Sequence, residues 1–518
     1  MQTVLPQHRK RALNWVKFIM LGVIALGVVF RFSHLSDRVY WHDETLTLYR
    51  AAGYTVADIL NGLFHGRVLS IDDVLKFQQL TPEKTTIDML VNSANDDQPL
   101  TPLYFLLTRF WMAGFGNDLV AIRIFSVLWS LLAFPCLYWL CLELFGSSIV
   151  GWIALGLLAV SPFQVYYAAE ARHYTVWTVL ILLMHLTLLR AIRQQTWKHW
   201  ALYALVTALG LYSNLVTCFV MLGHGIYIFV LERFRINRTT LAYVAASIAG
   251  LIAFSPWLYA LFINLRKMKD ATAWMTQTLP LKALTKVWLV NFQEAFLKPA
   301  LFPGRLQNAI ALLTIAVVIL SFYVLCRRTS SRVWLFVISA IVPLPVVLML
   351  QDLLLGGIRS TNSRYFFPCY LGIHIAVAYW LASKMTSDQA KPWQQKGWQL
   401  VAVMIFAVGA LSMPVQFRQG NSSSYQAVAD LINQVESPLV ISSEMAQGGG
   451  TLGDILSLAH LLNREVKMQL VIDPAAPKIP QQFKTVFLYK PSPSLTQTLS
   501  KQYPLKPLHP GGLWSMTQ

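Results

Sequence analysis

The sequence predicts an all-α polytopic membrane protein with about 11 transmembrane helices, further interfacial helices and a small C-terminal extracytoplasmic α/β domain. Of the 518 residues, 55% are hydrophobic and only 13% are charged, whereas an average soluble domain has about 25% charged residues. Apolar runs of about 20 residues, long enough to span a bilayer, recur up to about residue 415. Beyond that point the runs shorten and alternate between helix and strand patterns.

The composition also excludes several classes of protein. So few charges and so many apolar residues argue against a cytosolic enzyme and against a disordered chain. The balance of 42 Lys and Arg against 24 Asp and Glu gives a formal net charge of +18. In a multi-pass membrane protein such an excess gathers in cytoplasmic loops. We therefore expect contacts with membrane lipids and none with nucleic acid.

The first apolar run, at about 13–32, follows the basic stretch His8-Arg9-Lys10-Arg11. It has no small-x-small cleavage motif, which predicts a retained anchor rather than a removed signal peptide. The basic flank predicts a cytoplasmic N-terminus. Ten further runs are centred near residues 133, 157, 183, 206, 223, 252, 316, 343, 374 and 406.

The segment 99–115 decides the predicted topology. It is apolar but short, and it contains Pro102 and, near its middle, Arg109. As a span, it would put four short basic loops outside, against the positive-inside rule. As a helix lying on the membrane surface, it returns all four to the cytoplasm, so we predict eleven spans and an interfacial helix here. The four loops are 190–198, 232–238, 327–332 and 384–396.

This topology divides the chain into a transmembrane domain, 1–415, and a small α/β domain, 416–518, that lies outside. A bacterial inner membrane, which is a plasma membrane, fits this organisation best. The external parts of the first domain are the loops 34–120, 161–173 and 264–305 and the turn 356–364. In the tail, the pattern predicts helices at 425–435 and 452–462 and strands at 438–441, 466–472 and 485–489.

The first candidate site is the acid pair Asp43-Glu44, about eleven residues after the first run. Two adjacent carboxylates repel one another, and a metal ion, a cationic group or a role as base would explain them. A solvated loop start or a helix N-cap is an equally simple explanation of the charge pattern alone.

The second candidate is Glu170, which is followed by Arg172 and His173 at the end of a span. A carboxylate, a guanidinium and an imidazole within four residues at a membrane surface favour function over an interfacial ion pair. Arg123 opens the second span, and Arg364 lies in the outer turn before Tyr365. Guanidinium groups at headgroup depth suit a lipid phosphate, although snorkelling to ordinary headgroups is the simpler alternative.

These motifs together resemble the family 39 type of GT-C glycosyltransferases, which includes protein O-mannosyltransferases and lipid A aminoarabinose transferases. The resemblance extends over most of 15–385 and is most specific at Asp43-Glu44. One departure is that Leu100-Thr101-Pro102-Leu103-Tyr104 stands where the family often has His-Pro-Pro-Leu-Tyr. The motifs are Trp41-His42-Asp43-Glu44, Pro102-Leu103-Tyr104, Arg123, Glu170-Ala171-Arg172-His173-Tyr174 and Arg364-Tyr365.

The resemblance implies a glycosyltransferase of the cell envelope that moves a hexose or pentose from a polyprenyl-phosphate donor to a glycan, lipid or protein acceptor, with inversion. Asp43 would be the general base. Glu44 and Glu170 would shape the site or hold a divalent cation such as Mg, Mn or Ca. The groups expected to contact substrate are Tyr104, Arg123, Arg172, His173, Arg364 and Tyr365.

Two other functions compete with this one. A transporter or lipid flippase could use the same acids to couple ions, but transporter sites usually lie near the midpoints of spans, and these acids lie at one face. A scaffold that only displays the C-terminal domain would leave Asp43-Glu44 and the outer arginines unexplained.

Overall fold

The computed structural model describes residues 7–33, 35–36, 38, 40–96, 98–298, 301–302, 304–387, 389–421, 424–445 and 450–516. The chain divides into two compact units, each described here by itself. The first unit contains residues Met1–Leu35, Gln98–Leu103 and Arg123–Gln416. The second contains residues Ser36–Asp97, Tyr104–Ile122 and Phe417–Gln518. The external loop 34–120, which the sequence analysis places in the first domain, therefore contributes mostly to the same unit as the C-terminal tail.

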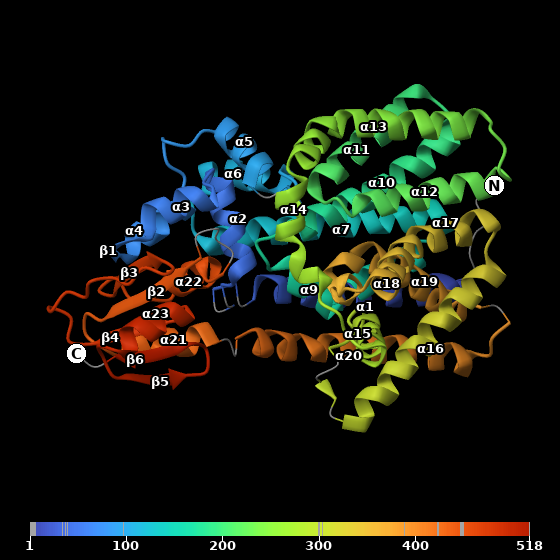
Figure 1. Cartoon of the computed structure of the whole chain (residues 1–518). Helices are drawn as coiled ribbons and strands as arrows, with labels where there is room; N and C mark the ends of the chain where they lie inside the picture. The colour runs from blue at the N-terminus through green and yellow to red at the C-terminus, as the bar shows by residue number, and fades with distance from the viewer. Residues whose placement is uncertain are drawn as a thin grey trace. The chain divides into compact units, whose positions relative to one another are not determined.

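The first unit is built from helices, among which α10, α11 and α13 pack side by side (Figure 1). Its helices are α1 (Gln7–Phe32), α7 (Leu119–Phe145), α8 (Ser148–Val160), α9 (Pro162–Ala168), α10 (Tyr174–Gln194), α11 (Trp197–Ser213), α12 (Thr217–Leu231), α13 (Arg238–Ile263), α14 (Leu265–Ala271), α15 (Leu281–Gln293), α16 (Gly304–Arg328), α17 (Ser331–Ile341), α18 (Pro343–Leu355), α19 (Phe367–Met385) and α20 (Pro392–Asn421). The first residues of α7 and the last residues of α20 belong to the second unit. Short 3₁₀ turns follow α14 and α18: η2 (Ala273–Thr276), η4 (Arg359–Thr361) and η5 (Ser363–Phe366).

Each of the eleven predicted apolar runs forms a helix or a pair of helices. Among the described residues, eight helical segments are long and apolar enough to cross a membrane, or nine when the bent pair α8–α9 counts as one span. The runs near 206 and 223 form α11 and α12, which have 17 and 15 residues and are shorter than the roughly 20 that a span needs. The all-α polytopic fold class is confirmed, and the count of eleven stays a prediction.

The bend between α8 and α9 is 64° and is stabilised from α1. The guanidinium of Arg31 donates to the carbonyls of Ala159 (2.9 Å) and Leu158 (3.0 Å) at the end of α8. These carbonyls have no partner within their own helix, and a cation at a helix C-terminus is favourable. Gly27 lets α1 approach, because a Cβ there would overlap the Ala159 carbonyl. Arg31 therefore caps the end of α8 at the bend, and α9 begins after its own N-cap, Ser161.

The second unit is an α/β structure with one six-stranded sheet in the order β1-β3-β2-β4-β6-β5 (Figure 1). The central strands β3, β2 and β4 are parallel, and the outer strands pair antiparallel. Its strands are β1 (His65–Ser70), β2 (Leu439–Glu444), β3 (Lys467–Ile472), β4 (Val486–Tyr489), β5 (Leu505–His509) and β6 (Leu513–Met516). Its helices are α2 (His42–Ala52), α3 (Val56–Leu63), α4 (Ile71–Leu75), η1 (Lys76–Gln78), α5 (Thr86–Asp96), α6 (Leu103–Phe115), α21 (Ser424–Asn433), α22 (Leu452–Ala459) and α23 (Pro493–Ser500).

Both faces of this sheet are covered, which is why β2 is buried along its whole length. Side chains alternate between the faces: Val440 joins a core formed with α2, α3, α4, α21 and α22. Its neighbours Leu439 and Ile441 join a second core formed with α23. The small sheet region predicted for the tail is confirmed, with strands β2, β3 and β4 at the predicted positions.

Strand β1 joins the external loop to the tail. It pairs antiparallel with β3, with His65 opposite Val471 and Ser70 opposite Lys467. Because the two strands share a sheet, both segments must lie on one side of any membrane that the helices of the first unit cross.

We expect single cysteines introduced at Glu83 and Gln497, in a variant without the five native cysteines, to react from the same side of sealed membranes. Both side chains are exposed, and the basic-loop argument places this side outside the cytoplasm. A cysteine at Lys198, in a predicted cytoplasmic loop, is the control and should react only after the membrane is permeabilised. Labelling of all three from one side would contradict the eleven-span topology.

Candidate active site

The acid pair lies in the first turn of α2. The helix begins at His42, and Trp41 occupies the N-cap position without a side-chain capping bond. Asp43 is therefore not the N-cap. Carboxylates are favourable in the first turn of a helix because of the helix dipole. Glu44 is fully buried, whereas Asp43 is partly exposed. Of the two acids, Asp43 is thus the one that a substrate can reach.

The opposite end of α2 is held by Arg109. Its Nη1 donates to the carbonyls of Ala51 and Ala52, both at 3.0 Å, and Nη2 donates to the carbonyl of Lys84. The side chain is buried. The arginine that looked anomalous in an apolar run is therefore a C-terminal cap for the helix that carries the acids. This capping contact is not indicated by the sequence pattern, in which Arg109 bears only on the topology.

Arg109 belongs to α6, which corresponds to the predicted interfacial segment 99–115. The helix has 13 residues, too few to span a bilayer. Its position on a membrane surface stays a prediction. Tyr104, in the first turn of α6, is buried.

In the first unit, Glu170, Arg172 and His173 lie in the tight turn between α9 and α10. All three are buried: Glu170 is 0% exposed, Arg172 4% and His173 9%. The backbone N–H of Arg172 donates to the carbonyl of Glu170 at 2.7 Å. The Nδ2 of Asn214 lies 2.9 Å from His173 Nε2, so the amide can donate to the ring. Asn214 is a partner that the sequence pattern did not indicate.

This turn meets the segment that carries Arg364. The ring of Tyr174 stacks on Phe367 with centroids 5.4 Å apart, and Tyr167 lies 5.3 Å from the same ring. Tyr167 is within electrostatic range of both Glu170 and Arg364. The structure therefore brings the predicted acid and the predicted phosphate-binding arginine of this unit to one place.

A cavity of about 160 Å³ adjoins this place. Its lining includes Tyr166, Tyr167 and Ser363, together with Glu294 and Lys298. The latter two form an ion pair at 3.5 Å. Neither Glu294 nor Lys298 is among the site residues predicted from the sequence. Their charges now border the same cavity as the tyrosines.

The turn 356–364 is organised by the buried Asp352. Its carboxylate accepts the backbone N–H groups of Arg359 (3.1 Å) and Ser360 (2.6 Å) and lies 3.4 Å from the Arg359 guanidinium. The outer arginine Arg359 is thus engaged within the protein. Helix α15 also supports the turn, because Trp288 donates to Ser360 Oγ at 2.8 Å. The hydroxyl of Tyr365 lies 4.0 Å from Met275 Sδ.

Arg123 lies at the start of the first unit's part of α7 and is fully buried. Its Nη1 donates to the carbonyl of Leu35 at 2.5 Å. This bond ties α7 to the chain that leaves α1. Its predicted contact with substrate stays a prediction.

The predicted residues fall into two groups. Asp43, Glu44 and Tyr104 belong to the second unit. The first unit contains Arg123, Glu170, Arg172, His173, Arg364 and Tyr365. Across the part of the chain that the structure describes, no group of three or more His, Cys, Asp or Glu side chains is placed to hold a metal ion.

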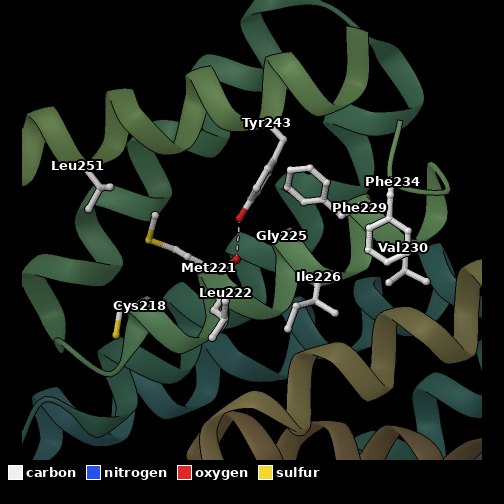
Figure 2. A pocket seen from close by; sticks show the side chains of 10 residues that line it. All are labelled: Cys218, Met221, Leu222, Gly225, Ile226, Phe229, Val230, Phe234, Tyr243 and Leu251. Atoms are coloured by element: carbon white, nitrogen blue, oxygen red, sulfur yellow. Dashed lines mark hydrogen bonds between the residues drawn. The ribbon is translucent and has the colours of Figure 1, made fainter. Parts of the chain in front are cut away.

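A separate open pocket of about 680 Å³ lies between α12 and α13 (Figure 2). The hydroxyl of Tyr243 donates to the carbonyl of Met221 at 2.6 Å across it. The lining includes no charged side chain. Apart from the Cys218 thiol and the Tyr243 hydroxyl, the lining is apolar.

Comparisons with known proteins bear on this architecture. Residues 97–259 match a family model described as dolichyl-phosphate-mannose-protein mannosyltransferase. A crystal structure of ArnT from Cupriavidus metallidurans bound to undecaprenyl phosphate is similar with a TM-score of 0.55 at 13% identity, covering 97% of this chain and 98% of that one. The apo structure of the same protein gives a TM-score of 0.54 at 13% identity, covering 98% of both chains. The chain has a GT-C glycosyltransferase fold. No curated protein matches its sequence.

The GT-C fold confirms the family resemblance. The family match includes Tyr104, Arg123 and the turn from Glu170 to His173, whereas Asp43 and Arg364 lie outside it. The protein is thus an integral membrane protein with a GT-C fold, and the roles of individual residues remain predictions.

Proposed function

We propose that the protein transfers a sugar from a polyprenyl-phosphate donor to an acceptor hydroxyl on the outer face of the membrane, with inversion. The observation that carries this proposal is the acid pair of α2 in a GT-C fold, with one acid buried and the other accessible. The similar ArnT structure is described as bound to undecaprenyl phosphate, which supports a polyprenyl-phosphate donor. A bacterial inner membrane fits this donor.

In the proposed reaction, Asp43 accepts the proton of the acceptor hydroxyl as its oxygen attacks the anomeric carbon. The bond from that carbon to the phosphate oxygen breaks, and the electron pair leaves with the polyprenyl phosphate. A phosphate monoester is a good leaving group, with a second pKa of about 6, so no general acid is needed. Stabilising its developing charge is the main electrostatic task, which we assign to Arg172 and Arg364.

The remaining groups orient the substrates. Glu44 and Glu170 shape the site, and Tyr104, Arg123, His173 and Tyr365 line it. A divalent cation (Mg, Mn or Ca) at Glu44 and Glu170 is proposed as an addition, and no step above depends on it. The acceptor is a glycan, a lipid or a protein, and the sugar is a hexose or a pentose.

The direct test compares outer glycans by mass spectrometry in cells with and without the protein, followed by transfer from a purified polyprenyl-phosphate sugar to the acceptor so identified. A sugar that disappears without the protein and is transferred by the purified protein supports the proposal. A transporter is the alternative. Movement of a solute or lipid across proteoliposomes, with no new glycosidic bond, would replace the proposal with that function.

We expect Arg364→Ala to weaken use of the polyprenyl-phosphate donor. Loss of one charge-assisted hydrogen bond to phosphate should cost about 1.5–3 kcal/mol, measured as a rise in donor KM or a fall in kcat. Arg359→Ala is the matched control within the same turn: its guanidinium is engaged by Asp352, so we expect a loss of stability without a specific loss of donor affinity. Unchanged kinetics for Arg364→Ala would remove it from the donor site.

A further inference from the structure

Helix α22 of the C-terminal tail lies directly against the start of α2. Gly453, in the first turn of α22, is buried. A Cβ at this position would overlap the imidazole ring of His42, with the Nδ1, Cε1 and Cγ atoms as its nearest neighbours. His42 is the first residue of α2 and precedes Asp43. The absence of a side chain at Gly453 is therefore what allows the two helices to approach at this point.

A second contact fixes the residues just before α2. The ring of His460, immediately after α22, meets the ring of Tyr40 edge-on, with centroids 4.3 Å apart. The Tyr40 hydroxyl donates to Gln78 Oε1, and His460 Nε2 lies 3.1 Å from the same oxygen. Gln78 thus links the segment just before α2 with the residue that follows α22.

The two helices also share a hydrophobic core. Tyr49 and Ala52 of α2 pack in one cluster with Leu452, Ile455 and Leu456 of α22. All five are buried. The position of α2 therefore depends on where α22 lies over its length as well as at its start.

Helix α22 itself is anchored to the sheet. The carboxylate of Glu444, at the end of β2, accepts the backbone N–H groups of Gly450 (2.9 Å), Thr451 (2.7 Å) and Leu452 (2.5 Å) at the start of α22. Asp454 pairs with Lys490 at 2.5 Å, after β4. The sheet thus holds the start of α22, and with it Gly453, in place.

The Tyr425 hydroxyl also donates to Asp454. Burial, and then the Asp454 carboxylate, raise the pKa of this hydroxyl. It therefore stays protonated and keeps donating over the physiological pH range.

We propose that the C-terminal domain is a positioning element for the transferase site: α22, through the close approach of Gly453 to His42, sets the location of Asp43. The inference rests on the proposed function, in which Asp43 is the base. It assigns to the tail a role in catalysis that acts through α2 and needs no contact between the tail and the substrate.

The test is Gly453→Ala. The new methyl group must displace the imidazole ring of His42, the first residue of α2. A displacement of about 1 Å at a catalytic group can cost about 10²-fold in rate, so we expect kcat to fall by about that factor while donor KM stays unchanged. Gly114→Ala is the matched control: Gly114 lies in α6 of the same unit, with open space around its Cβ position, and kcat should not change.

A second substitution separates positioning from general damage. If overlap with the imidazole causes the fall in kcat of Gly453→Ala, the double variant that also carries His42→Ala should have the same kcat as His42→Ala alone. Failure of this rescue in a folded double variant would overturn the proposal, as would normal kcat in Gly453→Ala. Should Gly453→Ala not fold, Tyr40→Phe, which removes only the hydroxyl bonded to Gln78, must lower kcat at constant donor KM; unchanged kcat would overturn it.

A readout that does not need transferase activity distinguishes failure of this proposal from failure of the proposed function. In a variant without native cysteines, Asp43→Cys places a thiol at the position in question. Gly453→Ala should change the rate at which that thiol is alkylated, and Gly114→Ala should not. If alkylation responds but the wild-type protein transfers no sugar, the coupling of α22 to α2 stands and the assigned reaction is wrong. An unaltered alkylation rate overturns the coupling itself.

Discussion

Asp43→Asn should lower turnover by about 10²–10⁴-fold, the usual contribution of a positioned general base. The amide keeps the shape of the side chain but no longer accepts the proton of the acceptor hydroxyl. Donor binding should survive, because the proposed phosphate contacts come from Arg172 and Arg364. The measurement is single-turnover transfer from a labelled polyprenyl-phosphate sugar, together with donor binding.

Three companion variants sharpen this prediction. Glu83→Gln removes an exposed acid of the same unit and should leave turnover unchanged. Glu44→Gln should be milder than Asp43→Asn unless Glu44 holds a cation. If Asp43→Asn is active and Glu44→Gln is dead, the roles within the pair are exchanged. If both are active and Glu170→Gln is dead, the base lies in the turn between α9 and α10.

Arg109→Ala should destabilise the end of α2 by roughly 2–6 kcal/mol, because two of its carbonyls lose a charged donor and each orphaned acceptor costs about 1–3 kcal/mol. These are the carbonyls of Ala51 and Ala52, and the carbonyl of Lys84 loses the same donor. Hydrogen exchange of the α2 backbone amides reports this loss directly. Turnover should fall as well, since the same helix carries Asp43.

The matched control for this prediction is Arg67→Ala in β1. Arg67 is exposed, and a surface substitution of this kind usually changes stability by less than about 0.5 kcal/mol. Arg109→Lys should be intermediate, because an ammonium keeps the charge but loses the fork that reaches several carbonyls at once. Unchanged exchange protection in Arg109→Ala would show that the packing of α2 suffices without its cap.

Much of the fold was predictable because local sequence patterns determine where its helices and central strands form. Long apolar runs specify helices that are buried in the protein or span a membrane, and each of the eleven runs is helical in the structure. The three central strands were found for the same reason, since β2, β3 and β4 are short, strongly apolar segments. Strands β1, β5 and β6 were missed. Strands β1 and β5 are largely exposed edge strands, and β5 contains a proline, which edge strands tolerate. Strand β6 has only four residues.

The candidate residues were also identifiable from local sequence, because acids and arginines stand out against an apolar background. Their partners were not. Arg109 looked like a topological anomaly, and only its contact with the end of α2 shows that it is a cap. Arg359 lies in the same outer turn as Arg364, and only the structure shows that the buried carboxylate of Asp352 engages its guanidinium. A hydrogen-bond donor in a sequence does not specify which carbonyl it will reach.

The sequence by itself determined a polytopic helical membrane protein, a terminal α/β segment, and the acids and arginines that could act on a lipid-linked sugar. The tertiary structure decided that the external loop completes the sheet of the tail through β1 and β3, and that α22 lies against the first turn of α2 at Gly453. The physical reason is that periodicity and charge indicate which residues of a segment are buried and which face water or lipid. The choice of partner between segments some 400 residues apart depends on shape and hydrogen-bond register, which form only when the chain has folded.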